Sequence, residues 1–316
     1  MPSPTPTILV VGATGNTGRA TVRTLSADLA GQNVRILGLT RSVDSEPAQE
    51  LRKLPLVEIG GKYWPEIDAA WLRDRNVVKA FVAVSPSDAQ FTDESLLYRA
   101  LLEARVEYVV RISTWAPYIG PASPIFYGRS HWALETMLED PSFDALMWTS
   151  LRPTVFSRQM VEPAAEAIKK YRSTGSFGHV SLWLAADVPG AWIEPDDVGK
   201  IAGKLLVLAD PSPHASQKYV INGPEDITGN DIIAEMERLT GGKVTDVSFG
   251  SDNIFNSFRE NGVPEKLIRS LWTAIGMFLD GKARFSEVEP TAQSIMDLAP
   301  PTTTCRETLR YLAGEK

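Results

Sequence analysis

The chain has 316 residues, of which 43% are hydrophobic and 22% charged, as expected for a globular protein of one large or two coupled domains. Its net charge of −7 argues against a nucleic-acid partner, and its single cysteine, Cys305, excludes a disulfide framework or a cysteine-rich zinc site. No run approaches the roughly 18 apolar residues of a membrane span. The start "MPSPTPT" lacks the features of a secretory signal, so we expect a cytoplasmic protein without a membrane partner.

Short apolar runs alternate with amphipathic runs over the first half of the chain. The run at 7–14, "TILVVGAT", predicts a buried parallel strand, and the run at 18–30 predicts a helix. Further strands are expected at 33–41, 56–61, 79–86, 107–114 and 145–153, with helices at 93–106 and 131–140. This alternation at short spacing predicts an α/β fold with a Rossmann-type, doubly wound parallel sheet.

The alternation loosens after Pro153. Helices are expected at 161–173, 195–209 and 228–242, a strand at 218–223, and mostly helical structure up to about residue 290. The stretch 177–193, rich in Trp and Gly, fits neither pattern. We therefore predict a first domain at 1–157, to which 190–222 return, and a smaller, mostly α-helical C-terminal substrate lobe formed by 158–189 and 223–316.

The segment "VVGATGNTG" places Gly12, Gly15 and Gly18 between the first predicted strand and the first predicted helix. In a dinucleotide-binding turn the first glycine allows the sharp turn. The second lets the backbone approach a phosphate, and the third lets helix and strand pack closely. The helix N-terminus would hold the pyrophosphate, because its free N–H groups and dipole favour an anion. A tight turn without a ligand is the alternative interpretation.

The end of the second predicted strand indicates which dinucleotide is bound. NAD sites have an acidic residue in this region for the ribose 2′-hydroxyl. Here the strand ends "LTRS", and Arg41 and Ser42 suit a 2′-phosphate, which a guanidinium binds through two parallel hydrogen bonds. We therefore predict NADP(H) as the cofactor. Alternatively, Arg41 is a solvated surface residue.

Several segments in this order make the chain resemble the NmrA-like family of atypical short-chain dehydrogenases/reductases. They are "GATGNTG" at 12–18, "TR" at 40–41, "ISTWAP" at 112–117, "HWALE" at 131–135, "LRPTVF" at 151–156, "IEPDDVG" at 193–199 and "NGPEDIT" at 222–228. The resemblance covers essentially the whole chain. It implies a Rossmann domain that binds NADP(H) and a C-terminal lobe over the nicotinamide.

The resemblance also assigns residues to the cofactor site. These are Gly12, Thr14, Gly15, Asn16, Thr17, Gly18, Arg41, Val84, Ser85, Pro86, Pro153, Thr154 and Phe156. In the family, a serine at the position of Ser113 commonly orients a substrate carbonyl, and a lysine usually stands at the position of His131.

Tyr127, His131 and Glu135 are spaced by four residues in "FYGRSHWALE", which places them on one face of a helix. Tyr127 and His131 are therefore candidates for the proton donor, with Glu135 able to raise the pKa of His131 or to fix its tautomer. The alternative is structural. Gly128 weakens the first turn, so that Tyr127 could precede the helix, and Glu135 could simply pair with an arginine such as Arg111 or Arg152.

Four aromatic residues fall in segments expected near the cleft and are candidate substrate contacts, although core packing explains each equally well: Trp115, Tyr118, Trp183 and Trp192. The sequence offers no metal site. We predict an NADPH-dependent reductase of a small apolar or conjugated carbonyl, quinone or imine, possibly of secondary metabolism. One alternative is an NADP-sensing regulator that binds a protein partner without turnover. Another is a non-redox isomerase or dehydratase with His131 as acid/base.

Overall fold

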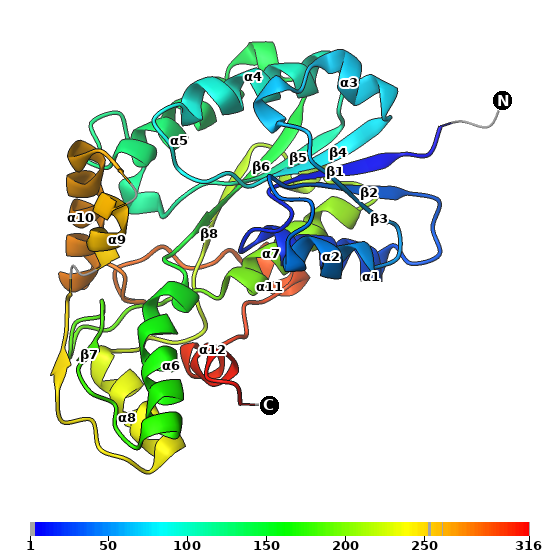
Figure 1. The fold of residues 1–316 in the computed structure, drawn as a ribbon. Helices are drawn as coiled ribbons and strands as arrows, with labels where there is room; N and C mark the ends of the chain where they lie inside the picture. The colour runs from blue at the N-terminus through cyan, green and yellow to red at the C-terminus, as the bar shows by residue number, and fades with distance from the viewer. Residues whose placement is uncertain (1–3, 252–253, 261, 316) are drawn as a thin grey trace.

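The computed structural model describes residues 4–251, 254–260 and 262–315, and these contain a seven-stranded parallel sheet (Figure 1). The strands are ordered β3-β2-β1-β4-β5-β6-β8. Their bounds are β1 Thr7–Val11, β2 Arg35–Leu39, β3 Val57–Gly60, β4 Val77–Val82, β5 Tyr108–Ile112, β6 Met147–Pro153 and β8 Gln217–Ile221. Every neighbouring pair is parallel, which confirms the predicted doubly wound sheet.

Helices cover both faces of this sheet, as Figure 1 shows. One face carries α3 Ala69–Asp74, α4 Gln90–Glu103 and α5 Phe126–Leu138. The other face carries α1 Gly18–Asp28, α2 Glu46–Arg52, α7 Pro195–Val207 and α11 Gln293–Leu298. The strands are buried on both faces because their side chains alternate between two apolar clusters, one under each helical layer.

The remaining elements form a lobe beside the carboxyl ends of the strands. They are α6 Ser157–Thr174, β7 Val180–Ser181, α8 Gly229–Thr240, β9 Val247–Ser248, α9 Ile254–Glu260, α10 Glu265–Leu279 and α12 Cys305–Leu312. The lobe is mostly helical, as expected, with one short parallel pair between β7 and β9. Residues 252–253 and 261, which fall within the predicted helical stretch, lie outside the described residues.

Helix α5 begins at Phe126, five residues before the predicted start at 131. Tyr127 is therefore part of the helix rather than of the loop before it. Gly128, which weakens a helix in isolation, is needed here, because a Cβ at this position would overlap the backbone carbonyl oxygen of Tyr118. Tertiary packing thus overrides the local propensity.

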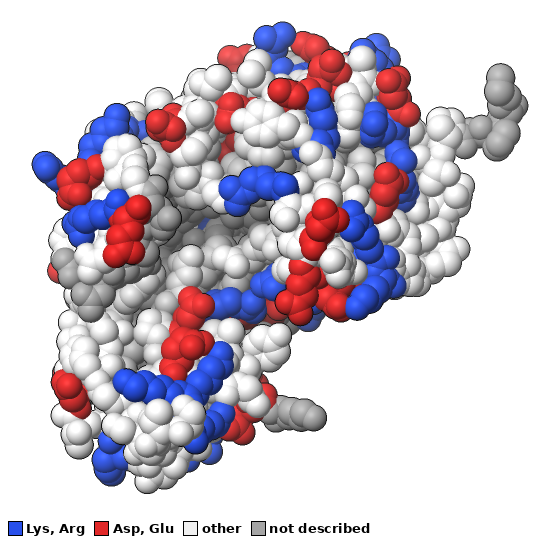
Figure 2. All heavy atoms as spheres, viewed as in Figure 1, with Lys and Arg blue, Asp and Glu red and all other residues white. Residues whose placement is uncertain are grey.

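The parallel strands bring their carboxyl ends to one edge of the sheet. The direction of the strand order reverses between β1 and β4, and ligands of doubly wound sheets bind at such a reversal. Figure 2 shows a hollow in the surface between the α3–α5 layer, α10 and the rest of the lobe. Five loops leave the sheet at this carboxyl edge, namely those that follow β1, β2, β4, β5 and β6. They form the candidate site.

Candidate active site

The loop between β1 and α1 forms a turn that depends on glycine at two positions. Gly12 has a φ of +80°, a conformation that side chains rarely adopt, and a Cβ there would also overlap the carbonyl oxygen of Ala83. A Cβ on Gly18 would overlap the carbonyl oxygen of Gly12. The first and third glycines therefore let the start of α1 pack closely against the ends of β1 and β4.

The middle of this loop presents unpaired backbone donors to the surface. Gly15 and Asn16 are exposed, and a Cβ on Gly15 would meet only the Gly12 carbonyl oxygen, at 3.1 Å. Within the described chain, the backbone N–H groups of Asn16, Thr17 and Gly18 donate to no acceptor. Thr17 is the N-cap of α1 but makes no side-chain cap. Together with the helix dipole, these donors form a site suited to an anion.

Side chains at the end of β2 border the same loop. The hydroxyl groups of Thr14 and Thr40 are 2.8 Å apart and tie the glycine loop to β2. Arg41 and Ser42, which follow Thr40, are exposed. The guanidinium of Arg41 has no hydrogen bond or ion pair to any residue that the structure describes, whereas the Ser42 N–H donates to the Thr40 hydroxyl. Arg41 is thus free to bind a ligand phosphate.

The other predicted cofactor residues lie at or after the carboxyl ends of β4 and β6. Val84 is half-buried, and Ser85 and Pro86 are exposed, in the loop after β4. Pro153 ends β6, and the hydroxyl of Thr154 is buried and donates to the backbone oxygen of Ala191, 2.7 Å away. Phe156 is half-buried and bridges to the 193 position. Both the hydroxyl and the backbone N–H of Thr154 are therefore paired within the protein, the N–H with the Ile221 oxygen.

His131 is enclosed beneath α4 and α5, with only 5% of its surface exposed. Its Nδ1 lies 2.9 Å from the Arg111 guanidinium, and its Nε2 lies 3.2 Å from the side-chain amide of Gln90. Because arginine can only donate, Nδ1 accepts, and the neutral ring carries its hydrogen on Nε2, which then faces the amide nitrogen of Gln90, itself a donor, rather than an acceptor. Burial, and next the charge of Arg111, hold the pKa of His131 well below its ordinary value, so the neutral form is favoured.

The neighbour of His131, Arg111 on β5, is the centre of a buried polar network that the sequence did not reveal. All five of its N–H groups face an acceptor. The acceptors are the side chains of Glu94, Tyr98, His131, Glu135 and Ser150. Such complete pairing is what makes a fully buried guanidinium tolerable.

Glu135 completes this network by pairing with both Arg111 and Arg152. Burial alone would raise the pKa of Glu135, but the hydrogen bonds and charges of the two arginines outweigh it and lower the pKa to about 2. Glu135 therefore pairs with arginines, which is the structural alternative that the sequence left open for it. Lining of the cofactor site by His131 stays a prediction, and its enclosed ring gives no support to His131 as the proton donor.

Tyr127 and Ser113 are less constrained than His131. The Tyr127 hydroxyl has no hydrogen-bond partner among the described residues, and burial raises the pKa of Tyr127 above its ordinary value, so the phenol stays protonated. Ser113 follows β5, and its Oγ is buried without a hydrogen-bond partner among the described residues. Both hydroxyl groups are therefore available to a ligand that reaches them.

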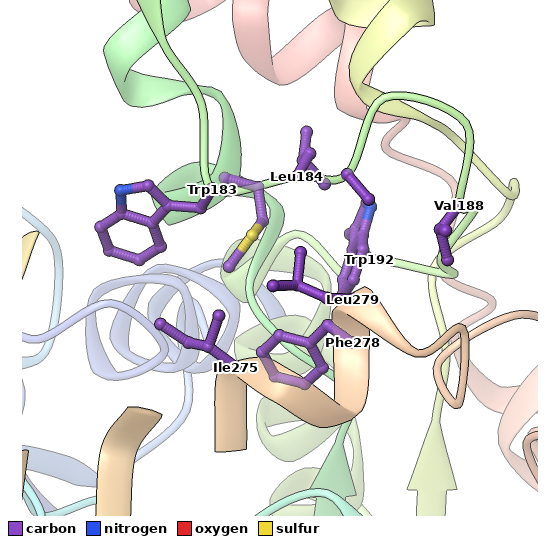
Figure 3. Close-up of a pocket in the computed structure, with 9 residues that line it drawn as sticks. Trp183, Leu184, Val188, Trp192, Ile275, Phe278 and Leu279 are labelled. Carbon is purple, nitrogen blue, oxygen red and sulfur yellow. The ribbon is translucent and has the colours of Figure 1, made fainter. Parts of the chain in front are cut away.

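The four predicted substrate residues lie in one apolar cluster of the lobe. Trp183 and Trp192 line a narrow pocket, whereas Trp115 and Tyr118 contact its edge through Phe278 (Figure 3). The full lining is Met160, Trp183, Leu184, Ala185, Val188, Trp192, Ile275, Phe278 and Leu279. No charged side chain is among them. The contributions of α6 and α10 were not predicted, because nothing in either helix distinguishes a pocket residue from a core residue.

Two features are absent from the residues that the structure describes, a cluster of metal ligands and a membrane-spanning helix. No group of three or more His, Cys, Asp or Glu side chains there is arranged to hold a metal ion. No helix there is both long and apolar enough to cross a bilayer.

Comparison with known proteins gives consistent results. The model of the NmrA-like family matches residues 4–307. A curated protein of Streptomyces griseus, (4-alkanoyl-5-oxo-2,5-dihydrofuran-3-yl)methyl phosphate reductase, is 28% identical over 235 residues, or 74% of either chain. An NAD(P)H azoreductase of Xenophilus azovorans is 27% identical over 261 residues, which are 82% of this chain and 83% of that protein.

The fold also matches solved structures. An NADPH-dependent quinone oxidoreductase of Escherichia coli, solved with NADPH, matches with a TM-score of 0.70 at 20% identity, covering 96% of this chain and 99% of that one. At this identity the match concerns the fold alone.

Proposed function

Because the chain belongs to the NmrA-like family, we propose that it is an NADPH-dependent reductase of a small apolar or conjugated carbonyl, quinone or imine. Both curated relatives named above are reductases, and one of them is named for NAD(P)H. A family with this fold can host several functions, so the proposal depends on the site itself.

One observation carries the proposal: a glycine turn with three unpaired backbone donors at the point where the strand order reverses. These donors and the N-terminus of α1 suit a pyrophosphate. The unpaired guanidinium of Arg41 suits a 2′-phosphate, which favours NADP(H) over NAD(H). On this proposal residues 1–157 and 190–222 bind the dinucleotide, and 158–189 with 223–316 bind the substrate, except for α11, which packs on the sheet with α7.

When bound, the dinucleotide supplies the hydride. The loops at 84–86 and 153–156 would hold the nicotinamide half at the carboxyl edge of the sheet. The apolar pocket beside them would orient the substrate and exclude water through its lining of uncharged side chains. Substrate binding by Trp115, Tyr118, Trp183 and Trp192 is part of this proposal.

The proton is assigned to the hydroxyl of Tyr127. Reduction of a carbonyl, quinone or imine leaves a basic oxygen or nitrogen, which a neutral phenol can protonate. The phenol of Tyr127 is neutral at pH 7, and its hydroxyl has no partner among the described residues. Burial raises its pKa and so makes it a weaker acid, which means that the substrate atom must be strongly basic when it takes the proton. The Ser113 hydroxyl would orient the same substrate atom. His131, fixed between Arg111 and Gln90, is a positioning residue on this proposal.

A titration of the purified protein with NADPH, NADP, NADH and NAD tests the cofactor assignment. We expect binding of NADPH and NADP to be at least tenfold tighter than binding of their unphosphorylated counterparts, and Arg41→Ala to remove most of this preference. Oxidation of NADPH with a panel of quinones, enones and imines then tests the reaction. Absence of NADPH binding would refute the proposal.

The enclosed position of His131 favours a second candidate function, that of an NADP-sensing regulator with a protein partner. The lysine that the family usually has at this position carries a positive charge, whereas His131 is neutral and accepts a hydrogen bond from Arg111. A sensor would bind NADPH tightly and fail to oxidise it with every member of the panel. The non-redox alternative with His131 as acid/base finds less support, because both ring nitrogens already face protein groups.

A further inference from the structure

Two buried polar groups just after β5 have no hydrogen-bond partner in the described part of the chain. They are the Oγ of Ser113 and the Nε1 of Trp115. Buried donors in native proteins are nearly always paired, so each exception needs an explanation. A ligand that accepts hydrogen bonds would provide one.

The two groups lie on the same side of the chain. Burial alternates from residue 111 to 115, with Arg111, Ser113 and Trp115 buried and the residues between them half-buried. In extended backbone, alternate side chains share one face, so Ser113 and Trp115 lie on one side of the segment that follows β5, where Trp115 packs against Tyr118 and Phe278. They could therefore address one substrate atom together.

Phe278 of α10 connects Trp115 to the pocket. Its ring centre lies 5.5 Å from that of Trp115 and 5.4 Å from that of Trp192, and its side chain lines the pocket (Figure 3). Trp115 itself is only 1% exposed and is not part of the pocket wall. A substrate ring that entered the pocket would therefore reach Trp115 by displacing the ring of Phe278.

Phe278 is half-buried and packs both against the pocket cluster and against a small separate cluster of α9 and α10 that contains Phe255, Ile268 and Ile275. Trp192 in the same pocket wall is buried, and its indole N–H donates to the Ile227 backbone oxygen at 3.3 Å. Of these two rings, Phe278 is therefore the one that a ligand could displace without breaking a hydrogen bond.

We propose that the indole N–H of Trp115, with the hydroxyl of Ser113, binds the acceptor atom of a flat, uncharged aromatic substrate that displaces Phe278. This rests on the proposed reductase function. An indole N–H can only donate, so it selects a quinone oxygen or an azo nitrogen over a plain hydrocarbon ring. The uncharged pocket lining selects against anionic substrates.

The proposal predicts an unusual combination for Trp115→Phe. This change keeps an aromatic ring and removes a donor that has no partner among the described residues, so the midpoint of thermal unfolding should fall only by the cost of the smaller buried side chain. Trp192→Phe is the matched control. It removes a donor that is already paired, although the Ile227 oxygen keeps its second hydrogen bond from the Gly190 N–H, so the midpoint should fall further than in Trp115→Phe.

The binding test compares 1,4-naphthoquinone with naphthalene, which has the same ring shape without the acceptor oxygens. Equilibrium dialysis with excess NADP avoids turnover. Trp115→Phe should weaken naphthoquinone binding about three- to tenfold, as expected for one hydrogen bond, and leave naphthalene binding unchanged. Phe278→Ala should strengthen binding of both ligands, whereas Trp272→Ala, on the exposed side of the same helix at 42% exposure, should change neither.

Three results would overturn the proposal: equal weakening of both ligands in Trp115→Phe, no weakening of naphthoquinone, or a fall in its unfolding midpoint as large as that of Trp192→Phe. If Phe278→Ala weakens or does not change binding, the displacement step is wrong. If the wild-type protein binds naphthoquinone but never reduces it with NADPH, the reductase function fails, and the difference between the two ligands still tests the donor.

Discussion

The phenol of Tyr127 lies where burial favours its neutral form and where no described residue competes for its hydroxyl. Tyr127→Phe removes the hydroxyl and keeps the ring that packs against Tyr118 and Phe126. We expect kcat for quinone reduction to fall by roughly 100-fold or more, as for loss of a general acid, with the Kd of NADPH unchanged. Steady-state kinetics and a binding titration check this, and retention of full kcat would assign the proton to water or another group.

His131 makes the stability of the protein depend on pH in a defined window. Its pKa in the folded state lies well below the ordinary 6.5, so the unfolded chain binds the proton more readily. The stability contributed by neutral His131 is therefore fully present above about pH 6.5 and is lost as the pH falls toward the folded pKa. Urea unfolding at pH 7.5 and 5.5 should show a smaller loss for His131→Gln than for the wild type.

His214 must be considered in the same experiment, because burial lowers its pKa as well. His131→Gln should thus reduce the pH dependence without abolishing it. Glu135, whose folded pKa is about 2, loses its contribution only below its ordinary value of 4.5 and so lies outside this window. An unchanged difference between the two pH values in His131→Gln would show that the pKa of His131 is the same in the folded and unfolded states.

His131→Lys restores the residue type that the family usually has, but it should not restore a working pair with Tyr127. The new ammonium would lie in the buried network beside Arg111, with Arg152 on the other side of Glu135. A buried cation next to another costs stability, so we expect a lower free energy of unfolding and no gain in kcat. Urea unfolding and steady-state rates test this, and a rate increase at unchanged stability would contradict it.

At the scale of elements, the position of α5 depends on one close approach. Gly128→Ala would force a Cβ against the Tyr118 carbonyl oxygen and displace the first turn of α5, which carries Tyr127. We expect a clear loss of quinone reduction with little change in NADPH binding, because the glycine loop lies on other elements. Gly276→Ala is the matched control.

A Cβ on Gly276 meets nothing within 4 Å. That substitution replaces glycine by a better helix former in α10, so stability should stay constant or rise by about 0.5–1 kcal/mol. Kinetics, NADPH titration and thermal unfolding of both variants measure the difference. Equal activity of the two variants would show that α5 does not need its contact with the 116–118 turn.

The strands and the glycine turn could be predicted because their signals are local. A buried parallel strand is a short apolar run, and the turn needs glycine at fixed spacing. The Arg111 network could not be predicted in the same way. Its members come from α4, β5, α5 and β6, and an arginine in a strand reads equally well as a solvated residue until the fold brings Glu94 and Glu135 to it.

The sequence also did not predict the shortest helices or the contacts between elements that are far apart in the chain. Helices α2, α3 and α11 have seven, six and six residues, too few for a clear helical period. The candidate pocket depends on α6 and α10, whose lining residues Met160 and Ile275 are more than 100 residues apart in the chain. Trp183 and Trp192 were predicted as substrate contacts because their segment was expected near the cleft. Phe278 was not predicted, because only the tertiary fold places it against them.

At the scale of the whole molecule, the core beneath the glycine turn is built from distant parts of the chain. Ile8 and Val10 of β1 share one apolar cluster with residues of α7, β8 and α11. Gly199 of α7 packs so closely on α1 that a Cβ there would overlap the Thr17 carbonyl oxygen. We therefore expect the described chain to unfold as one cooperative unit rather than lobe by lobe.

Ile295 of α11 tests this coupling, because it is fully buried in the cluster of β1 although it lies near the end of the chain. Ile295→Ala should lower the free energy of unfolding by about 2–5 kcal/mol, the usual range for a large-to-small change in a core. Met296→Ala, at a neighbouring position that is 38% exposed, should change it by less than about 1 kcal/mol. NADPH binding and far-UV circular dichroism should be lost at the same temperature in both variants. If Ile295→Ala instead produces two separate transitions, α11 belongs to a unit that unfolds independently of the nucleotide-binding sheet.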